Sequence, residues 1–266
     1  MSIVIPCFNY GRFLSEAIES ALEQSHAPIE VIVIDDGSTD ETLQVAARFE
    51  PRITVLTQTN KGLVDVLNRG IREATGPYLT VLSADDRFSP TYVEALLAAL
   101  AADPSADYAY SAMQYFGAQT GVFEARPFSP ALLLAGNYVN GCALIRRDDA
   151  IAVGGYDPAL EQVTWEDWDF WLRMLAHGKT GVAVEAPLLL YRRHETQSRN
   201  PASRAAARRA VAMFRRLHPS LYERRTRPVG ELLLFAALVA DKIGWRHGLR
   251  LLDRLWGFPA EGRSRV

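Results

Sequence analysis

The first hundred residues alternate between short apolar runs and longer segments whose apolar residues recur at helical spacing. Short, nearly continuous apolar runs are typical of strands that are buried on both faces. Four such strands are predicted, at residues 2–6, 29–34, 53–57 and 78–82, and a helix follows each of them. Strands that alternate with helices usually form parallel sheets, because the chain must cross back between neighbours. The sequence therefore predicts an α/β fold with a mostly parallel central sheet flanked by helices.

After residue 105 the alternation is less regular. Further strands are predicted at residues 108–116, 140–146, 182–184 and 188–191, with a helix at about 166–177 and a loop-rich stretch at 117–137. One helix start is predicted in detail, with Ser89 as the N-cap and Pro90 as the first helical residue. In the 166–177 helix, Asp169 and Arg173 are spaced to form an i,i+4 ion pair. We predict one domain at residues 1–198, divided into halves at 1–105 and 106–198, and a helical tail at 199–266.

Composition limits the function and the compartment. The formal net charge is −2, so the whole chain has no electrostatic reason to bind nucleic acid. The two cysteines, Cys7 and Cys142, form no spacing pattern, and free thiols in a reducing cytosol are expected. No signal peptide is recognised, and no apolar run approaches the ~20 residues that span a bilayer. We therefore expect a cytoplasmic protein.

The tail combines basic and apolar segments. Arginines crowd its first part, where Glu223 is the only acid, and the second part is apolar over 232–240 and amphipathic to Trp256. A basic, amphipathic helix can dock on an anionic membrane surface, where each basic residue contributes about 1 kcal/mol. Two other interpretations remain open. The tail could pack on the domain with its arginines in water, or residues 232–256 could form the interface of a homodimer.

Two acidic pairs follow predicted strands. Asp35 and Asp36 end the second strand, and Asp85 and Asp86 end the fourth. Ligands of open α/β sheets bind in the crevice beyond the carboxyl ends of the strands. Adjacent carboxylates repel unless they share a cation, and Mg²⁺ or Mn²⁺ carrying a substrate diphosphate would meet that need. The alternative is a solvated turn in which the acids only cap the next helix.

A third acidic group lies at the start of the 166–177 helix. Trp165 and Trp168 flank Glu166 and Asp167 there. Indole rings offer stacking surfaces for sugars, and a water-poor setting raises the pKa of a carboxyl group towards that of a general base. The alternative is that these acids only complement the helix dipole.

Several other kinds of site are excluded by their missing motifs. The sequence contains no G-x-x-x-x-G-K-[ST] phosphate loop, and the first strand runs into Cys7-Phe8-Asn9-Tyr10-Gly11 where a dinucleotide fold would have G-x-G-x-x-G. No histidine and cysteine cluster has zinc spacing, and no G-x-S-x-G elbow occurs.

The ordered set of motifs over residues 1–200 resembles glycosyltransferase family 2, the inverting nucleotide-sugar transferases of the type A fold. The matching pieces are Ser2 to Asn9, Val33 to Asp40, Asn60 to Gly62, Asn68 to Gly70, Ser83 to Asp86, Gly154 to Asp157, Glu166 to Asp169 and Tyr191 to His194. Each piece alone is weak, but their order along the chain is specific. The resemblance implies that residues 1–105 bind the nucleotide and that residues 106–198 receive the acceptor.

The resemblance also implies roles for single residues. Asp167 would deprotonate the acceptor hydroxyl, with Glu166 as the second choice. The nucleotide would be bound by Pro6, Phe8, Asn9, Asp35, Asp36, Asn60, Lys61, Ser83 and Asp85. The metal ion, Mn²⁺ or Mg²⁺, would be held by Asp85, Asp86 and His194. Trp165, Trp168 and Arg192 would face the acceptor or the diphosphate. A lone histidine such as His194 is otherwise more often a surface residue.

One departure from the family pattern affects the metal site. The motif commonly reads Asp-x-Asp-Asp, and its first position here is Ser83, which supplies no charge. The implied function is transfer of a sugar from a nucleotide diphosphate, most simply UDP, to a saccharide or lipid-linked saccharide. The implied setting is polysaccharide assembly at the cytoplasmic face of a bacterial membrane. The alternatives are a degenerate nucleotide-binding module and a nucleotidyltransferase on the same fold.

Overall fold

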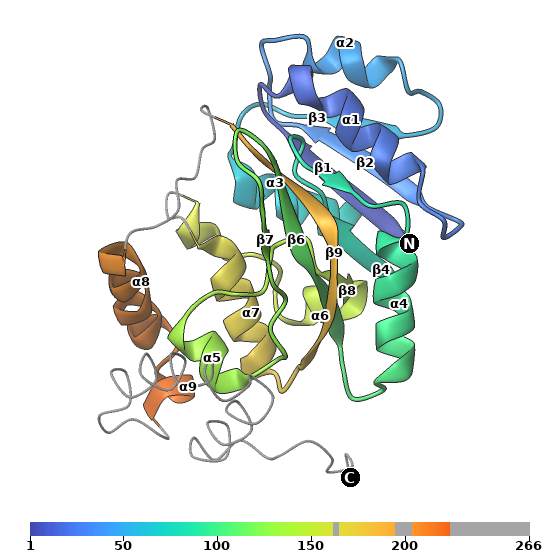
Figure 1. Cartoon of the computed structure of the whole chain (residues 1–266). Helices are drawn as coiled ribbons and strands as arrows, with labels where there is room; N and C mark the ends of the chain where they lie inside the picture. The colour runs from blue at the N-terminus through green and yellow to red at the C-terminus, as the bar shows by residue number, and fades with distance from the viewer. Residues whose placement is uncertain (162–164, 195–203, 224–266) are drawn as a thin grey trace.

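The computed structural model describes residues 1–161, 165–194 and 204–223. Within these ranges one nine-stranded sheet runs through the molecule, in the order β3-β2-β1-β4-β8-β6-β9-β5, and β7 pairs with β6 (Figure 1). The strands are β1 (Ser2–Cys7), β2 (Glu30–Asp35), β3 (Thr54–Thr57), β4 (Tyr78–Val81), β5 (Arg87–Phe88), β6 (Tyr108–Gly117), β7 (Gly121–Phe123), β8 (Leu144–Arg146) and β9 (Gly181–Arg193). The first four strands are parallel to one another, and β5, β7 and β8 are antiparallel to their neighbours. The predicted α/β fold is confirmed.

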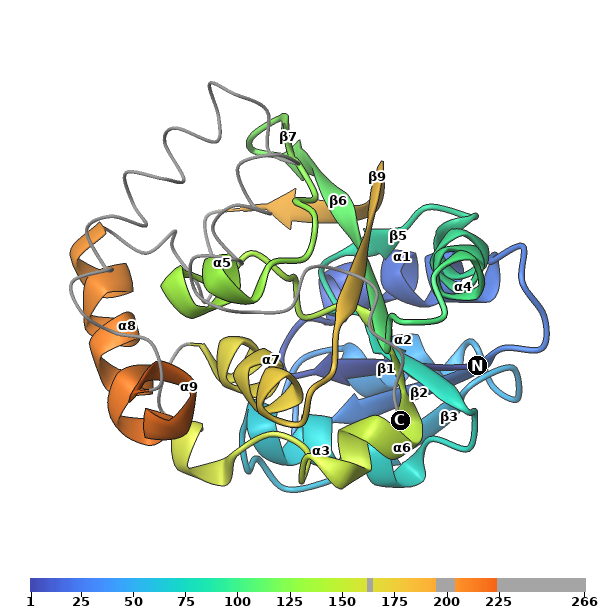
Figure 2. The ribbon, with the colours of Figure 1, turned by 90° about the horizontal axis from the view of Figure 1, so that it is seen from below.

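Helices cover both faces of the sheet. They are α1 (Gly11–Leu22), α2 (Thr42–Ala47), α3 (Leu63–Glu73), α4 (Tyr92–Ala102), α5 (Pro130–Ala135), α6 (Arg147–Ala152), α7 (Glu166–Ala176), α8 (Arg204–Leu217) and α9 (Pro219–Glu223), with a short 3₁₀ turn at Pro158–Leu160. Figure 2 shows α1 and α4 on one side of β1 to β4, and α3 and α6 on the other. This is the layered arrangement that strand and helix alternation predicts.

The side chains of β1 and β2 explain why both faces are covered. Alternate residues of a strand point to opposite faces. Ile3 and Ile5 pack with α1, α2 and α4, while Val4 and Ile32 pack with α3, α6 and α7. All four side chains are buried. Their burial on two sides accounts for the continuous apolar runs in the sequence.

Three predicted boundaries were wrong. The strand predicted at residues 140–146 begins only at Leu144, as β8. The strands predicted at 182–184 and 188–191 form one strand, β9, whose pairing with β6 shifts between Val184 and Pro187. Proline cannot donate to a strand ladder, so the chain bulges there and then continues as the same strand. Helix α4 begins at Tyr92 and not at Pro90, and its N-cap is Thr91; Ser89 to Thr91 form a preceding turn in which the Ser89 carbonyl accepts the N–H of Tyr92.

The 117–137 stretch holds more regular structure than predicted, whereas the described part of the tail is helical and matches one of the interpretations left open above. The stretch contains strand β7 and helix α5. In the tail, Phe214 of α8 and Tyr222 of α9 are buried in the same core cluster as α5 and α7, and both views place α8 beside α7 (Figures 1 and 2). Residues 204–223 therefore pack on the domain. The membrane or dimer surface predicted at 232–256 lies outside the described residues.

No helix in the described part of the chain is both long and apolar enough to cross a membrane.

Candidate functional site

A cavity of about 740 Å³ lies at the carboxyl ends of β1, β2 and β4. It is lined from both halves of the chain, since α7 and the loop before β8 form its far wall. The predicted site residues that line it are Pro6, Phe8, Asp36, Asn60, Ser83, Asp85, Asp86, Trp165, Glu166 and Asp167. Asn9, Asp35, Lys61, Trp168, Arg192 and His194 are not among the lining residues. The sheet thus brings most of the predicted set together, as the strand-end rule expects.

The first acidic pair shapes a loop. Asp36 is 4% exposed, and its carboxylate accepts the backbone N–H groups of Lys61 at 2.9 Å and Gly62 at 2.8 Å. Gly62 has a φ of 93°, which a residue with a side chain rarely adopts. Lys61 therefore contributes its backbone N–H to this loop, and it is not among the residues that line the cavity. Asp35 is also buried and accepts the N–H of Ser38 at 3.1 Å, so it braces the turn that follows β2.

Phe8 and Asn9 follow β1 and behave differently. The ring of Phe8 lines the cavity and is 42% exposed, which leaves a flat aromatic surface open to a ligand. Asn9 has a φ of 57° and joins two loops. Its N–H donates to the hydroxyl of Ser38 at 2.8 Å, and its side-chain oxygen accepts the N–H of Thr39 at 2.8 Å. Asn9 thus holds the rim of the cavity in shape.

The two members of the second acidic pair, Asp85 and Asp86, have different hydrogen-bond partners. Asp86 is 2% exposed, and its Oδ1 accepts the backbone N–H of Arg192 at 2.8 Å. Burial and the neighbouring charge of Asp85 raise the pKa of Asp86 well above its usual range, against the hydrogen bonds from Arg192 and Ser83. Asp85 instead lies 3.0 Å, through its Oδ2, from Nε2 of His194. Asp86 is thus bonded to the backbone of β9 and Asp85 to the side chain of His194, although both line the cavity.

Asp85 and His194 are predicted metal ligands that lie together, with Oδ2 and Nε2 3.0 Å apart, but only Asp85 lines the cavity. His194 lies two residues after Arg192 and, like it, contacts the ring of Phe13. The His194 ring is held between Tyr10, at 5.9 Å, and Phe13, at 5.0 Å between ring centres. No group of three or more acids, histidines and cysteines in the described ranges could enclose an ion by itself. A metal here would need further ligands from its substrate.

Arg192, predicted to face the acceptor or the diphosphate, is not among the residues that line the cavity. Its Nε donates to the backbone carbonyl of Asp85 at 2.8 Å, and its guanidinium lies over the rings of Phe13, at 4.7 Å, and Phe116, at 4.4 Å. The neighbouring Arg193 lines the cavity instead. Successive residues of a strand point to opposite faces, so only one of the two arginines can face the ligand. Arg192 braces the acidic loop from behind.

The start of α7 brings the predicted base into the cavity. Asp167 lines the cavity, and its Oδ2 accepts the side-chain N–H of Asn137 at 3.0 Å. Its Oδ1 accepts the backbone N–H of Trp168 at 2.8 Å. Trp165 precedes the helix with a φ of 105°, a strained conformation for a side chain of this size. Glu166 is 4% exposed, and its carboxylate accepts the N–H of Trp165 at 3.2 Å. Asp167 is therefore better placed than Glu166 to meet an acceptor.

The predicted stacking role of Trp168 is also corrected. Trp168 is 1% exposed, its ring packs on Phe214 at 4.9 Å, and its Nε1 donates to the carbonyl of Leu133 at 2.8 Å. Each residue of a helix turns by 100°, so the residue after Asp167 points away from the cavity. Trp165 is the tryptophan of the pair that lines it.

Some residues of the site were missed in the sequence. Asn137 is a single polar residue in a loop, and no spacing marks it. Tyr191 and Arg193 line the cavity, and the two-residue period of β9 could have identified them. The side chain of Asn68 bonds to both backbone groups of Tyr156, donating at 2.8 Å and accepting at 2.7 Å. This pairing joins two motifs that the sequence presents separately.

Both thiols lie in the cavity wall. Cys7 and Cys142 are free and buried, as predicted for unpaired cysteines. Burial raises the pKa of Cys7 to about 12 and that of Cys142 further. Neither thiol is therefore poised to act as a nucleophile.

Comparison with known proteins agrees with this geometry. The family model of Glycosyl transferase family 2 matches residues 2–154. EpsE of Bacillus subtilis is 31% identical over 198 residues, which is 71% of each chain. Other curated bacterial glycosyltransferases match over 94–100 residues, so this chain spans only about a third (30–33%) of their length.

Two solved structures share the fold. TarS of S. aureus in complex with UDP-GlcNAc gives a TM-score of 0.64 at 16% identity, covering 96% of this chain and 83% of that one. The mannosyltransferase PcManGT of Pyrobaculum calidifontis, in complex with GDP-Man and Mn²⁺, gives 0.58 at 17% identity, covering 97% and 84%. With the family match over more than half of its length, this chain belongs to glycosyltransferase family 2.

Proposed function

We propose that this chain transfers a sugar from a nucleoside diphosphate sugar, most simply a UDP-sugar, to a saccharide or lipid-linked saccharide, with inversion. One observation carries the proposal. Asp85, at the end of β4, and Asp167, at the start of α7, line the same cavity although they come from different halves of the chain. A donor site and a base for an acceptor then meet in one space. The UDP-GlcNAc complex of the structural neighbour TarS supports UDP as the first nucleotide to test.

The acceptor side supplies a single base. Asp167 takes the proton from the acceptor hydroxyl, whose oxygen attacks the anomeric carbon while the bond to the diphosphate breaks. Hydrogen bonds from Asn137 and from the Trp168 backbone fix both carboxylate oxygens. One displacement inverts the configuration, so no second carboxylate is needed as a nucleophile.

The donor side supplies the charge. Asp85 and His194 would hold a divalent cation together with the diphosphate. When bound, that cation would act as a Lewis acid on the leaving diphosphate. Asp86 and Arg192 keep the loop in place behind Asp85, and Arg193 adds a positive charge to the cavity wall. Because of Ser83, the site has one carboxylate fewer than the usual motif, so we expect it to bind the metal ion with modest affinity.

Binding of UDP tests the donor site. Calorimetric titration with and without Mn²⁺ should show metal-dependent binding in the wild type and its loss in Asp85→Ala. Binding that is equal without metal and in the variant would overturn the metal-dependent mechanism. UDP release from a panel of UDP-sugars then tests turnover. Nucleotide binding without release from any donor, with a range of acceptors, would favour a degenerate binding module.

The setting and the partners form part of the same proposal. We propose that the acceptor belongs to bacterial polysaccharide assembly, and that the tail at residues 199–266 provides contact with the membrane surface or, through residues 232–256, with a second copy. Sedimentation with anionic and neutral vesicles distinguishes these two roles, because only membrane contact depends on lipid charge. A dimer would instead show as a doubled mass in light scattering.

A further inference from the structure

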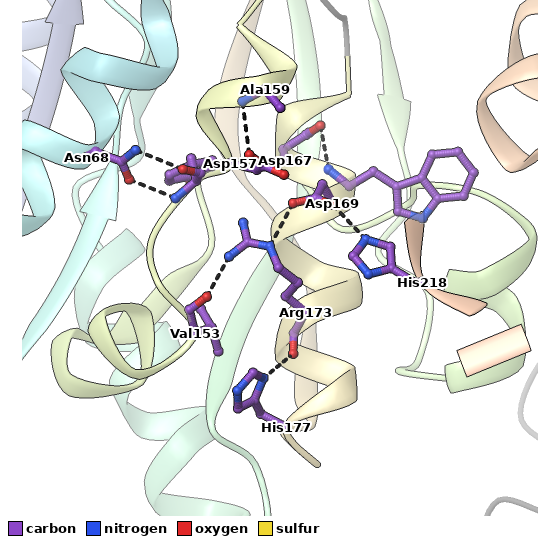
Figure 3. A network of polar contacts seen from close by, with 11 residues as sticks. Asn68, Val153, Asp157, Ala159, Asp167, Asp169, Arg173, His177 and His218 are labelled. Carbon is purple, nitrogen blue, oxygen red and sulfur yellow. Dashed lines mark hydrogen bonds and ion pairs between the residues drawn. The ribbon is translucent and has the colours of Figure 1, made fainter. Parts of the chain in front are cut away.

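A network of polar contacts surrounds α7 (Figure 3). Its centre is Asp169, which is 1% exposed. One oxygen of its carboxylate accepts Nε of Arg173 at 2.7 Å, and the other lies 2.7 Å from Nε2 of His218. His218 connects α8 to α9, so this contact ties the end of the described chain to the first turn of α7.

The first turn of α7 also carries the proposed base. Asp167 and Asp169 are two residues apart, so their side chains point to roughly opposite sides of the helix. Asp167 lines the cavity, whereas Asp169 meets α8 and α9. Both residues lie in one helical turn, so a contact that holds Asp169 also limits how far the backbone of Asp167 can move.

The same segment holds the partner of the base. The hydroxyl of Tyr222 donates to the carbonyl of Leu134 on α5 at 3.1 Å. Asn137 lies just beyond α5 and donates to Asp167. Residues 218–222 therefore contact both α5 and α7. Asn137 follows α5, Asp167 lies in α7, and the two form a hydrogen bond. The ring of Phe214 on α8 packs on Trp168 of α7, so α8 contacts the same group of helices.

Arg173 links the network to the donor half. Its Nη1 donates to the carbonyl of Val153 at 2.6 Å. The segment that follows Val153 contains Tyr156, whose backbone pairs with the side chain of Asn68 on α3 (Figure 3). Asp169 thus has two partners: Arg173, which is connected to α3 through this segment, and His218, which lies between α8 and α9. Asp169 is therefore linked both to the donor half, through Arg173, and to the α8–α9 turn, through His218.

We propose that His218 and Asp169 are a positioning pair for the transfer reaction, which holds the Asp167 carboxylate against Asn137 and towards the acceptor. This role rests on the proposed function of Asp167. A buried ion pair is weak evidence for stability, because apolar residues of similar volume often stabilise a core as well or better. Apolar packing does not set the direction of a carboxylate, whereas a hydrogen-bonded partner does.

The test compares variants at one position with a matched control. His218→Ala removes the contact, and His218→Gln restores a donor near the position of Nε2. His218→Asn places its amide nearer to the position of Nδ1 and should not restore it. Asp169→Asn changes the other partner. His177→Ala is the control, because His177 is exposed at the far end of α7 and bonds to that helix's own carbonyl at Arg173.

Two measurements test the proposed positioning role of His218 and Asp169. The first is UDP release from the donor that the wild type uses, with UDP affinity measured by calorimetry at a temperature where every variant is folded. We expect His218→Ala to lower kcat by about 10- to 100-fold, because small misplacements of a catalytic group can reduce rates this much. Its UDP affinity should be unchanged, His218→Gln should recover most of the rate, and His177→Ala should match the wild type.

The second measurement does not depend on activity. Hydrogen–deuterium exchange of peptides covering residues 136–142 and 165–170 should be faster in His218→Ala and Asp169→Asn than in His177→Ala. Wild-type kcat and unchanged exchange in His218→Ala would overturn the positioning role, and so would an equal fall in the Gln and Asn variants. If the wild type releases no UDP from any donor, the proposed function fails, and the exchange result alone still decides whether the pair holds the first turn of α7.

Discussion

The two walls of the cavity are held in different ways. On the donor side, Asp36 bonds to the backbone 25 and 26 residues away, and Asp85 and Asp86 are held by Arg192 and His194, 106 to 109 residues away. On the acceptor side, Asp167 bonds to Asn137, 30 residues away, and Asp169 to His218, 49 residues away. The donor wall is therefore held where the ends of strands meet β9, whereas the acceptor wall is held by contacts among α5, α7 and the α8–α9 turn. We expect a change in one set of contacts to affect its own wall more than the other.

The largest expected effect separates the two walls. Asp167→Asn keeps the shape of the side chain but removes the base, so the transfer rate should fall by about 10²–10⁴-fold. UDP affinity should not change, because the donor wall is intact. Steady-state kinetics with a competent donor and acceptor, combined with calorimetry, tests both statements. A parallel loss of UDP binding would mean that the two walls are not independent.

Substituting Asp169 tests the stability of the acceptor wall. Asp169→Asn leaves Arg173 and His218 facing an amide, and breaking a buried pair in this way lowers the free energy of unfolding by about 3–5 kcal/mol. Burial raises the pKa of Asp169, but the hydrogen bond from His218 and the charge and hydrogen bond of Arg173 outweigh it, so the pKa is lowered.

The sign of its pH dependence follows from that shift. A carboxyl group whose pKa is lower in the folded state stabilises the fold above its unfolded pKa, which is near 4. That contribution disappears as the pH falls through the lower, folded pKa. Urea unfolding of wild type and Asp169→Asn should therefore give a difference that is full at pH 6 and shrinks below about pH 4. A difference that grows on acidification would contradict the assignment.

Arg192 tests the donor wall from behind. Arg192→Ala removes the side-chain bond to the Asp85 carbonyl and the packing on Phe13 and Phe116. Changes behind a metal site typically reduce affinity by about 10- to 100-fold, and we expect a loss of that size in Mn²⁺-dependent UDP binding. Arg87→Ala is the control, since Arg87 also contacts Phe116 and Glu16. Equal losses in both variants would assign the effect to general packing.

The smallest expected effect concerns Trp168. Trp168→Phe removes the hydrogen bond to the Leu133 carbonyl, which should lower the free energy of unfolding by about 1 kcal/mol. The KM for the acceptor should stay the same, because Trp168 does not line the cavity. Trp165→Phe, on the cavity wall, is the comparison. A raised acceptor KM in Trp168→Phe alone would return Trp168 to the site.

The donor half illustrates what can be predicted from the sequence. The apolar runs that end in Asp36 and Asp85 mark buried strands, and the strand-end rule places both acids at one edge of the sheet. The two members of each acidic pair then separate, because neighbouring residues point in different directions. Asp85 and Asp86, or Arg192 and Arg193, are equivalent in the sequence until the register of β4 and β9 is known.

The sequence by itself determined the α/β layers, the family, the acidic strand ends and the helix that carries Asp167. These features are local, because they depend on the periodicity of neighbouring residues and on the chemistry at the end of a strand. The tertiary structure decided that Asn137 meets Asp167, that Trp168 and Arg192 face away from the cavity, and that His218 reaches Asp169. Those contacts join elements far apart in the chain, and only the packing of helices on the sheet determines which side chains meet.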